Sequence, residues 1–142
     1  ILWFFGGYFG LDKQTREERM KEHIETFDLK PHQDKEFREL SGGLKRRVML
    51  ARAMMNDPEF VIFDEPTAGV DVELRHELWG YLKDLNQKGK TILLTSHYIE
   101  EIEALCERVG VIHEGELVRV DNKEVLMQDK NSLEEKYLEL TQ

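Results

Sequence analysis

The sequence predicts an α/β fold built around a parallel β-sheet. Two short apolar runs, residues 60–63 and 91–95, have the length and the β-branched, aromatic or leucine content of buried strands. An amphipathic segment over residues 71–88 separates them and is long enough for the helix of a βαβ unit. Ligands of such sheets bind beside the carboxyl ends of the strands, so the residues that follow each run are the first candidates for a site.

The residues before the first run predict helices. Thr15 and Glu18 match the capping-box pattern that begins a helix, and Pro31 stops its continuation. Between them, apolar residues recur at helical spacing: Met20, Ile24 and Phe27. We therefore expect a helix over residues 15–29.

A loop and a second helix follow. The segment Leu40-Ser41-Gly42-Gly43 interrupts the helical pattern, because glycine is a poor helix former. After it, apolar residues return at helical spacing until the turn at Asn56-Asp57-Pro58: Leu44, Val48, Leu50, Ala51 and Met54. The sequence therefore predicts a helix that begins directly after a Ser-Gly-Gly loop.

The remaining residues complete the βαβ unit and extend it. Gly89 is a suitable residue to close the helix over residues 71–88, and a third helix is predicted over residues 98–107. A turn-forming pair, Glu114-Gly115, then separates two strands and predicts a hairpin over residues 109–120. Short helices are expected at the carboxyl end of the chain, near residues 123–128 and 132–140.

The charge of the chain argues against a nucleic-acid partner. Its 20 Lys and Arg against 29 Asp and Glu leave a formal net charge of −9, which repels a phosphate backbone. The densest basic run, Lys45-Arg46-Arg47, is interpreted as a solvated helix face. The single cysteine, Cys106, excludes an internal disulfide and fits a reducing compartment. No apolar run is long enough to span a membrane.

The Ser-Gly-Gly loop is the first candidate site. Ser41 supplies a hydroxyl, and Gly42 and Gly43 leave backbone N–H groups unobstructed at the start of a helix, where the helix dipole also favours an anion. We interpret the loop as a phosphate-binding segment. Taken alone, the same residues are also typical of an ordinary helix cap.

Two acids follow the first predicted strand. A carboxylate at the position of Asp64 can hold Mg²⁺ through water, the arrangement of a Walker B motif. Glu65, one residue further on, can orient and deprotonate the water that attacks a γ-phosphate. The alternative interpretation is a turn, because Asp-Glu-Pro after a strand also matches turn chemistry.

His97 follows the second predicted strand and reaches the same edge of the sheet. An imidazole there can bond the γ-phosphate and position the water that Glu65 activates. The alternative is a cap or surface residue. That is the interpretation given to the other histidines, because no zinc-binding pattern links them: His23, His32, His76 and His113.

Together these segments resemble the motifs of ABC ATPases. Their order and spacing match the signature, Walker B, D-loop and H-loop: Leu40-Ser41-Gly42-Gly43, Val61-Ile62-Phe63-Asp64-Glu65-Pro66, Ala68-Gly69-Val70-Asp71 and Ser96-His97. The resemblance covers essentially all of residues 1–142 and implies a partial ABC ATPase domain. About residues 1–57 would be the ABC helical subdomain with the signature. About residues 58–142 would be the carboxyl-terminal part of an incomplete P-loop NTPase (RecA-like) core.

The resemblance also implies a nucleotide sandwich formed by two subunits. Signature residues would close over the ATP held by the opposite subunit: Ser41, Gly42 and Gly43. Walker B and H-loop residues would serve the ATP and Mg²⁺ of their own subunit: Asp64 for the metal, Glu65 and His97 for catalysis. Asp71 of the D-loop would couple the two sites.

The partners that the resemblance implies are a second ABC ATPase subunit, in a homodimer, and a transmembrane permease. Leu44 stands where the family most often has Gln after the glycine pair, and this resembles the ABC-2-type exporter branch. The expected function is ATP hydrolysis that powers export across a membrane. The expected location is the cytoplasm, peripheral on the inner face of the cell membrane.

One departure from the family concerns the phosphate grip. The sequence contains no G-x-x-x-x-G-K-[ST] segment and no recognisable Q-loop, which lie upstream of the signature in the family. We therefore expect the chain to be the carboxyl-terminal portion of an ATP-binding subunit, unable to hydrolyse ATP by itself. A soluble ABC ATPase of translation or DNA repair is the alternative. In a third interpretation, the motifs are caps and turns of a non-catalytic interaction domain.

Overall fold

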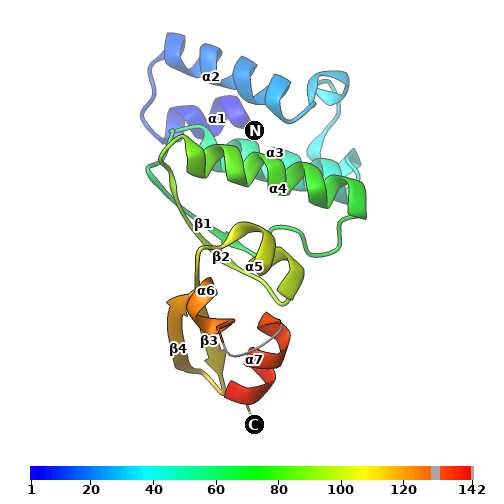
Figure 1. Cartoon of the computed structure of the whole chain (residues 1–142). Helices are drawn as coiled ribbons and strands as arrows, with labels where there is room; N and C mark the ends of the chain where they lie inside the picture. Colours follow the sequence, from blue (N-terminus) through cyan, green and yellow to red (C-terminus); the bar gives the residue numbers. More distant parts are fainter. Residues whose placement is uncertain (129–131, 142) are drawn as a thin grey trace.

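Figure 1 shows the computed structural model, which describes residues 1–128 and 132–141. A group of helices at the amino-terminal end is followed by a short parallel sheet, and a hairpin with two small helices lies at the carboxyl-terminal end. The elements are α1 (Leu2–Tyr8), α2 (Lys13–Thr26), the 3₁₀ turns η1 (Lys30–His32) and η2 (Phe37–Glu39), α3 (Gly42–Met54), β1 (Phe60–Asp64), α4 (Val72–Gln87), β2 (Thr91–Thr95), α5 (Ile99–Leu105), β3 (Arg108–His113), β4 (Glu116–Asn122), α6 (Lys123–Leu126) and α7 (Leu133–Leu140).

Strands β1 and β2 confirm the predicted βαβ unit. They pair in parallel, with Phe60 opposite Thr91 and Asp64 opposite Thr95, and α4 connects them. Because the strands run in the same direction and in register, their carboxyl ends meet at one edge of the sheet. That edge carries Asp64 on one strand and Thr95 on the other, as the position of the acids in the sequence predicted.

The prediction that both strands are buried on both faces is wrong for the described residues. Val61 and Phe63 are buried against the helices, whereas Ile62 and Leu93 are 61% and 52% exposed. Successive side chains of a strand point to opposite faces, and the main core lies on one of these faces. The apolar face of Ile62 and Leu93 is therefore open to solvent.

The hairpin over β3 and β4 is confirmed, but it forms a separate antiparallel sheet. Glu114 and Gly115 both have positive φ, 49° and 83°, which is the backbone of the tightest hairpin turns. Among residues 1–128 and 132–141, no helix has the length and apolarity needed to cross a bilayer.

Helix α2 begins earlier than predicted, because Asp12 and not Thr15 caps it. Asp12 Oδ1 accepts a hydrogen bond from the backbone N–H of Thr15 at 3.0 Å, and Oδ2 accepts one from its hydroxyl at 2.7 Å. The helix ends at Thr26, and Asp28 then adopts a left-handed φ of 50°, before Pro31 is reached. The Thr15 and Glu18 capping box was therefore the wrong assignment.

Helix α1 was not predicted, because Gly6 and Gly7 lie inside it. A Cβ added at Gly6 would meet Cγ of Arg16 at 2.4 Å. These glycines thus let the long side chain of Arg16 pack across α1, and the Arg16 guanidinium lies 4.6 Å from the ring centroid of Trp3. The close contact between α1 and α2 offsets the low helix propensity of glycine.

Two apolar clusters hold the chain together. The larger one joins α1–α4 to the inner face of β1 and includes Ala51, Met55 and Leu78. The smaller one joins α5, β3, α6 and α7, and half-buried Cys106 packs against it. Burial raises the pKa of the Cys106 thiol above its usual range.

We expect acid to weaken the helical part through His23. Its Nε2 lies 3.2 Å from the carbonyl of Met54, and burial lowers its pKa below the usual 6.5. In the unfolded chain the imidazole protonates near pH 6.5, whereas in the folded chain it resists protonation. The contribution of neutral His23 to the free energy of unfolding is therefore expected to be complete above pH 6.5. It should decrease as the pH falls from 6.5 through the lowered pKa.

Urea denaturation between pH 7.5 and 5 measures this dependence, and His23→Gln is expected to flatten it. Exposed His76 on α4 is the matched control, so His76→Gln should leave the slope in place. An equal slope in His23→Gln and the parent would contradict the assignment.

Candidate active site

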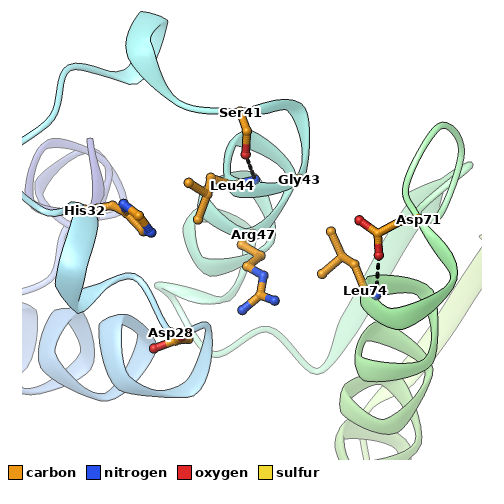
Figure 2. Close-up of a pocket in the computed structure, with 8 residues that line it drawn as sticks. All are labelled: Asp28, His32, Ser41, Gly43, Leu44, Arg47, Asp71 and Leu74. Atoms are coloured by element: carbon orange, nitrogen blue, oxygen red, sulfur yellow. Dashed lines mark hydrogen bonds between the residues drawn. The ribbon is translucent and has the colours of Figure 1, made fainter.

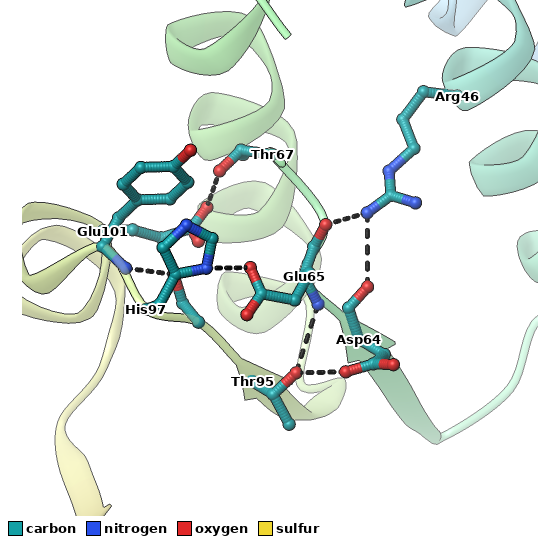
Figure 3. Close-up of polar contacts among 9 residues, drawn as sticks. Arg46, Asp64, Glu65, Thr67, Thr95, His97 and Glu101 are labelled. Carbon is teal, nitrogen blue, oxygen red and sulfur yellow. Dashed lines mark hydrogen bonds and ion pairs between the residues drawn. The ribbon is translucent and has the colours of Figure 1, made fainter. Parts of the chain in front are cut away.

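The carboxyl edge of the parallel sheet gathers the predicted acids (Figure 3). Asp64 ends β1, and its Oδ1 accepts a hydrogen bond of 2.5 Å from the hydroxyl of Thr95, which ends β2. The backbone N–H of Glu65 lies 3.1 Å from both the hydroxyl and the carbonyl oxygen of Thr95. Thr95 thus ties the ends of both strands together. Thr95 was not among the predicted site residues, although its register with Asp64 follows from the parallel pairing.

Glu65 and His97 face each other across this edge, as Figure 3 shows. His97 Nδ1 lies 2.6 Å from Oε2 of Glu65, and the His97 ring also packs on Tyr98 with the centroids 4.1 Å apart. The His97 side chain is 61% exposed and the Glu65 side chain 36% exposed, although Glu65 Oε2, the oxygen that faces His97, is itself buried. Since Nδ1 contacts the carboxylate, Nε2 is the ring nitrogen left for another partner.

The backbone of Glu65 has an unusual conformation. Its φ is 50°, in the left-handed region that few residues other than glycine adopt. Such residues cluster at functional sites, where surrounding contacts hold them in place. Here the turn directs the chain away from β1 while the Glu65 side chain faces His97.

Arg46 of the helix after the Ser-Gly-Gly loop supports this turn. Its Nε donates to the carbonyl oxygen of Pro66 at 2.6 Å, and its Nη2 donates to the carbonyl oxygens of Asp64, at 3.2 Å, and Glu65. One guanidinium therefore satisfies the carbonyls of consecutive residues at the end of β1. A planar group with several donors suits this task better than a lysine does.

The interpretation of the basic run as a solvated helix face is therefore wrong for two of its residues. Besides Arg46, Arg47 donates to the carbonyl oxygen of Phe27 at 3.2 Å and forms an ion pair of 2.5 Å with Glu77. Both arginines are half-buried. Composition alone does not distinguish such arginines from solvated ones, because the difference lies in which loop packs against the helix.

The signature-like loop lies beside the start of α4, around a hollow of about 280 Å³ (Figure 2). Ser41, Gly43 and Asp71 line it, together with Arg47 and His32. The structure therefore places the predicted residues in two groups. Asp64, Glu65 and His97 form one, and the loop residues with Asp71 form the other.

In this structure Ser41 and Asp71 both cap helices. Ser41 Oγ accepts a hydrogen bond from the backbone N–H of Leu44 at 3.3 Å, and Asp71 Oδ1 accepts one from Leu74 at 2.9 Å. A Cβ added at Gly43 would meet Leu74 Cδ2 at 2.8 Å, so glycine lets the two helix starts approach. Helix caps and phosphate sites use the same backbone amides, so the capping geometry is compatible with the predicted ligand.

Asp64 fits a role in holding Mg²⁺. Among residues 1–128 and 132–141, no group of three or more acidic, histidine or cysteine side chains could hold a metal by itself. Mg²⁺ in nucleotide sites is, however, usually bound by one or two carboxylates, water and the phosphates of the substrate. Asp64 offers such a carboxylate, since Thr95 occupies only one of its oxygens.

The chain is similar to known ABC transporter proteins in sequence and in fold. Residues 7–68 match a family model described as ABC transporter. The chain is 47% identical over 114 residues to Nod factor export ATP-binding protein I of Burkholderia lata, and the match covers 80% of this chain. The chain belongs to the ABC transporter family. A protein of the same name from Cupriavidus metallidurans is also 47% identical over 114 residues.

Solved ABC transporter structures confirm the predicted fold class. One solved structure, an ATP-binding subunit of an ABC transporter, shares 26% sequence identity with this chain and has a TM-score of 0.85. The match covers 99% of this chain and 62% of the other chain. A nucleotide-free ATP-binding cassette from an ABC transporter is 27% identical in sequence and has a TM-score of 0.75. That match covers 91% of this chain and 50% of the other chain. The chain spans 38% of the length of the two Nod factor export relatives.

We expect Arg46→Ala to destabilise the chain, because it leaves the carbonyls at the end of β1 without their donor. Hydrogen bonds from a charged donor each contribute about 1.5–3 kcal/mol, so the loss in the free energy of unfolding should be at least of that order. Arg38→Ala is the matched control, because Arg38 is 80% exposed and its ion pair is with the nearby, exposed Glu36. Urea denaturation measures both. Equal losses in the two variants would contradict the role of Arg46.

Proposed function

We propose that the chain provides the signature, Walker B, D-loop and H-loop elements of a subunit that hydrolyses ATP to power export across a membrane. The observation that carries this proposal is the edge of the β1–β2 sheet, where Asp64, Glu65 and His97 lie together. The similarity to Nod factor export ATP-binding proteins supports the exporter assignment.

The proposed hydrolysis step uses Glu65 as the general base. Its carboxylate takes a proton from the attacking water, and His97 Nδ1 lies 2.6 Å from Oε2 of the same carboxylate. Nε2 of the exposed His97 would donate to the γ-phosphate in the form of the imidazole that carries a proton on both ring nitrogens. Asp64 would hold Mg²⁺ through water. When bound, the ion neutralises charge on the phosphates.

A second subunit is proposed to complete the site. About residues 1–57 would act as the helical subdomain, and the amides of Gly42 and Gly43 with the Ser41 hydroxyl would meet the ATP of the opposite subunit. About residues 58–142 would act as the carboxyl-terminal part of the catalytic core. The hollow where Ser41 and Gly43 lie next to Asp71 supports a coupling role for the D-loop carboxylate.

The proposed partners are a second copy of the subunit and a transmembrane permease, with the subunit peripheral on the cytoplasmic face of the membrane. The formal net charge of −9 argues against a nucleic-acid partner. The test is to reconstitute the full-length gene product with the permease encoded beside it and to measure ATP hydrolysis. Stimulation by the permease is expected. Hydrolysis that is indifferent to any permease would instead favour a soluble ABC ATPase.

The 142-residue chain alone is proposed to be inactive, because its sequence has no G-x-x-x-x-G-K-[ST] segment to grip the β- and γ-phosphates. Calorimetric titration with Mg-ATP checks this, and no binding is expected in the micromolar range. Micromolar binding would show that another segment grips the phosphates and would overturn this part of the proposal.

A further inference from the structure

A buried carboxyl group lies behind the candidate active site. Glu101 of α5 is completely buried, as is Thr67 of the loop between β1 and α4. Glu101 Oε1 accepts hydrogen bonds from the Thr67 hydroxyl at 2.8 Å and from the Trp79 indole N–H at 3.0 Å (Figure 3 draws the first). Its Oε2 has no hydrogen-bond partner among the described residues. Burying a carboxyl oxygen without a partner costs free energy, which points to a functional reason for placing Glu101 here.

The positions of these residues along the chain indicate what the contact joins. Thr67 follows Glu65 by two residues, and Glu101 follows His97 by four. The hydrogen bond between Thr67 and Glu101 therefore links the loop that carries the proposed base to the helix that begins just after the proposed phosphate sensor. The indole N–H of Trp79 donates to the same carboxyl oxygen, and this second hydrogen bond joins α5 to α4 and not to the loop after β1.

The contact between Glu65 and the exposed His97 side chain contributes little stability by itself, although Glu65 Oε2 is buried. Exposed ion pairs contribute on the order of 0–1 kcal/mol, because water screens them and both side chains lose freedom. His97 is 61% exposed. Water does not screen a hydrogen bond between fully buried groups in this way. The side chains that form it are already restricted by packing, so they lose less freedom.

We propose that Thr67 and Glu101 are positioning residues that set the distance between Glu65 and His97. The proposal rests on the proposed function of that pair. Loss of the Thr67 hydroxyl frees the loop after β1 from α5, so Glu65 and His97 no longer keep a fixed separation. Misplacement of a catalytic group by about 1 Å can lower a rate by about 10²-fold.

The test compares two variants that each remove one hydrogen bond to the same carboxyl oxygen. In the full-length gene product, Thr67→Val is expected to lower kcat for ATP hydrolysis by about tenfold or more, with KM for ATP unchanged, and Thr67→Ser to restore it. Trp79→Phe, which spares the link between the loop and α5, should keep kcat within about twofold of the parent. Thermal denaturation of each variant shows whether the fold is intact, and Thr67→Ala replaces Thr67→Val if the latter does not fold.

Equal kcat losses in Thr67→Val and Trp79→Phe, or a parental kcat in Thr67→Val, would overturn the positioning role. Glu65→Gln in the same series separates this failure from failure of the proposed function. If Glu65→Gln stops hydrolysis while Thr67→Val does not change it, only the positioning role is lost. If Glu65→Gln also hydrolyses normally, the assignment of Glu65 as the base fails first.

Discussion

Replacing Glu65 with Gln is expected to lower ATP turnover of the full-length gene product by about 10²–10⁴-fold, the usual contribution of a general base. Gln keeps the size and a hydrogen-bonding oxygen of Glu but cannot accept a proton from water. The geometry that predicts this result is the 2.6 Å contact between Glu65 and His97 at the end of β1. Nucleotide binding should persist, because the other proposed contacts to ATP and Mg²⁺ are untouched.

The measurement is phosphate release under saturating Mg-ATP, with nucleotide binding measured separately. Glu59→Gln is the matched control, because exposed Glu59 precedes the amino end of the same strand. It should leave turnover at the parental level. Parental turnover in Glu65→Gln would contradict the assignment of Glu65 as the general base. Loss of nucleotide binding would show that Glu65 contributes to binding instead.

The second large effect concerns stability. Leu78 of α4 is 3% exposed in the larger apolar cluster, so Leu78→Ala should lower the free energy of unfolding of the 142-residue chain by about 2–5 kcal/mol. The loss combines the removed apolar contacts with the cavity that remains. A lower midpoint in urea denaturation, with an unchanged slope, is the expected observation.

Leu138→Ala serves as its control. Leu138 of α7 is 49% exposed, and surface substitutions of this kind usually change stability by about 0.5 kcal/mol or less. Similar losses in the two variants would mean that α4 does not hold the core together in solution.

Residue spacing was enough to predict the elements that position the candidate site. The apolar run that ends at Asp64, the stripe along α4 and the closing Gly89, with a φ of 86°, each follow from local rules. Parallel pairing then brings Asp64 beside Thr95 without any further information. The acids and His97 could therefore be proposed as neighbours from the sequence alone.

Local sequence rules could not predict the contacts between distant segments. Arg46 was interpreted as solvated because the three carbonyls it meets belong to a loop about twenty residues further along. Glu101 likewise resembles any other acid of an exposed helix until α5 is placed against Thr67 and Trp79. Gly6 and Gly7 are poor helix formers, yet the packing of Arg16 against them makes them part of a helix. In each case a tertiary contact outweighed the local preference.

The state of Cys106 has a practical consequence for spectroscopy. It is the single cysteine of the chain, it is half-buried, and its raised pKa leaves little of the reactive thiolate at neutral pH. Maleimide reagents should therefore react much faster with a cysteine introduced at an exposed position than with Cys106. Spin labels or fluorophores placed on the turn at Glu114-Gly115 and near Ser41 could report distances between and within subunits, with the native cysteine left in place.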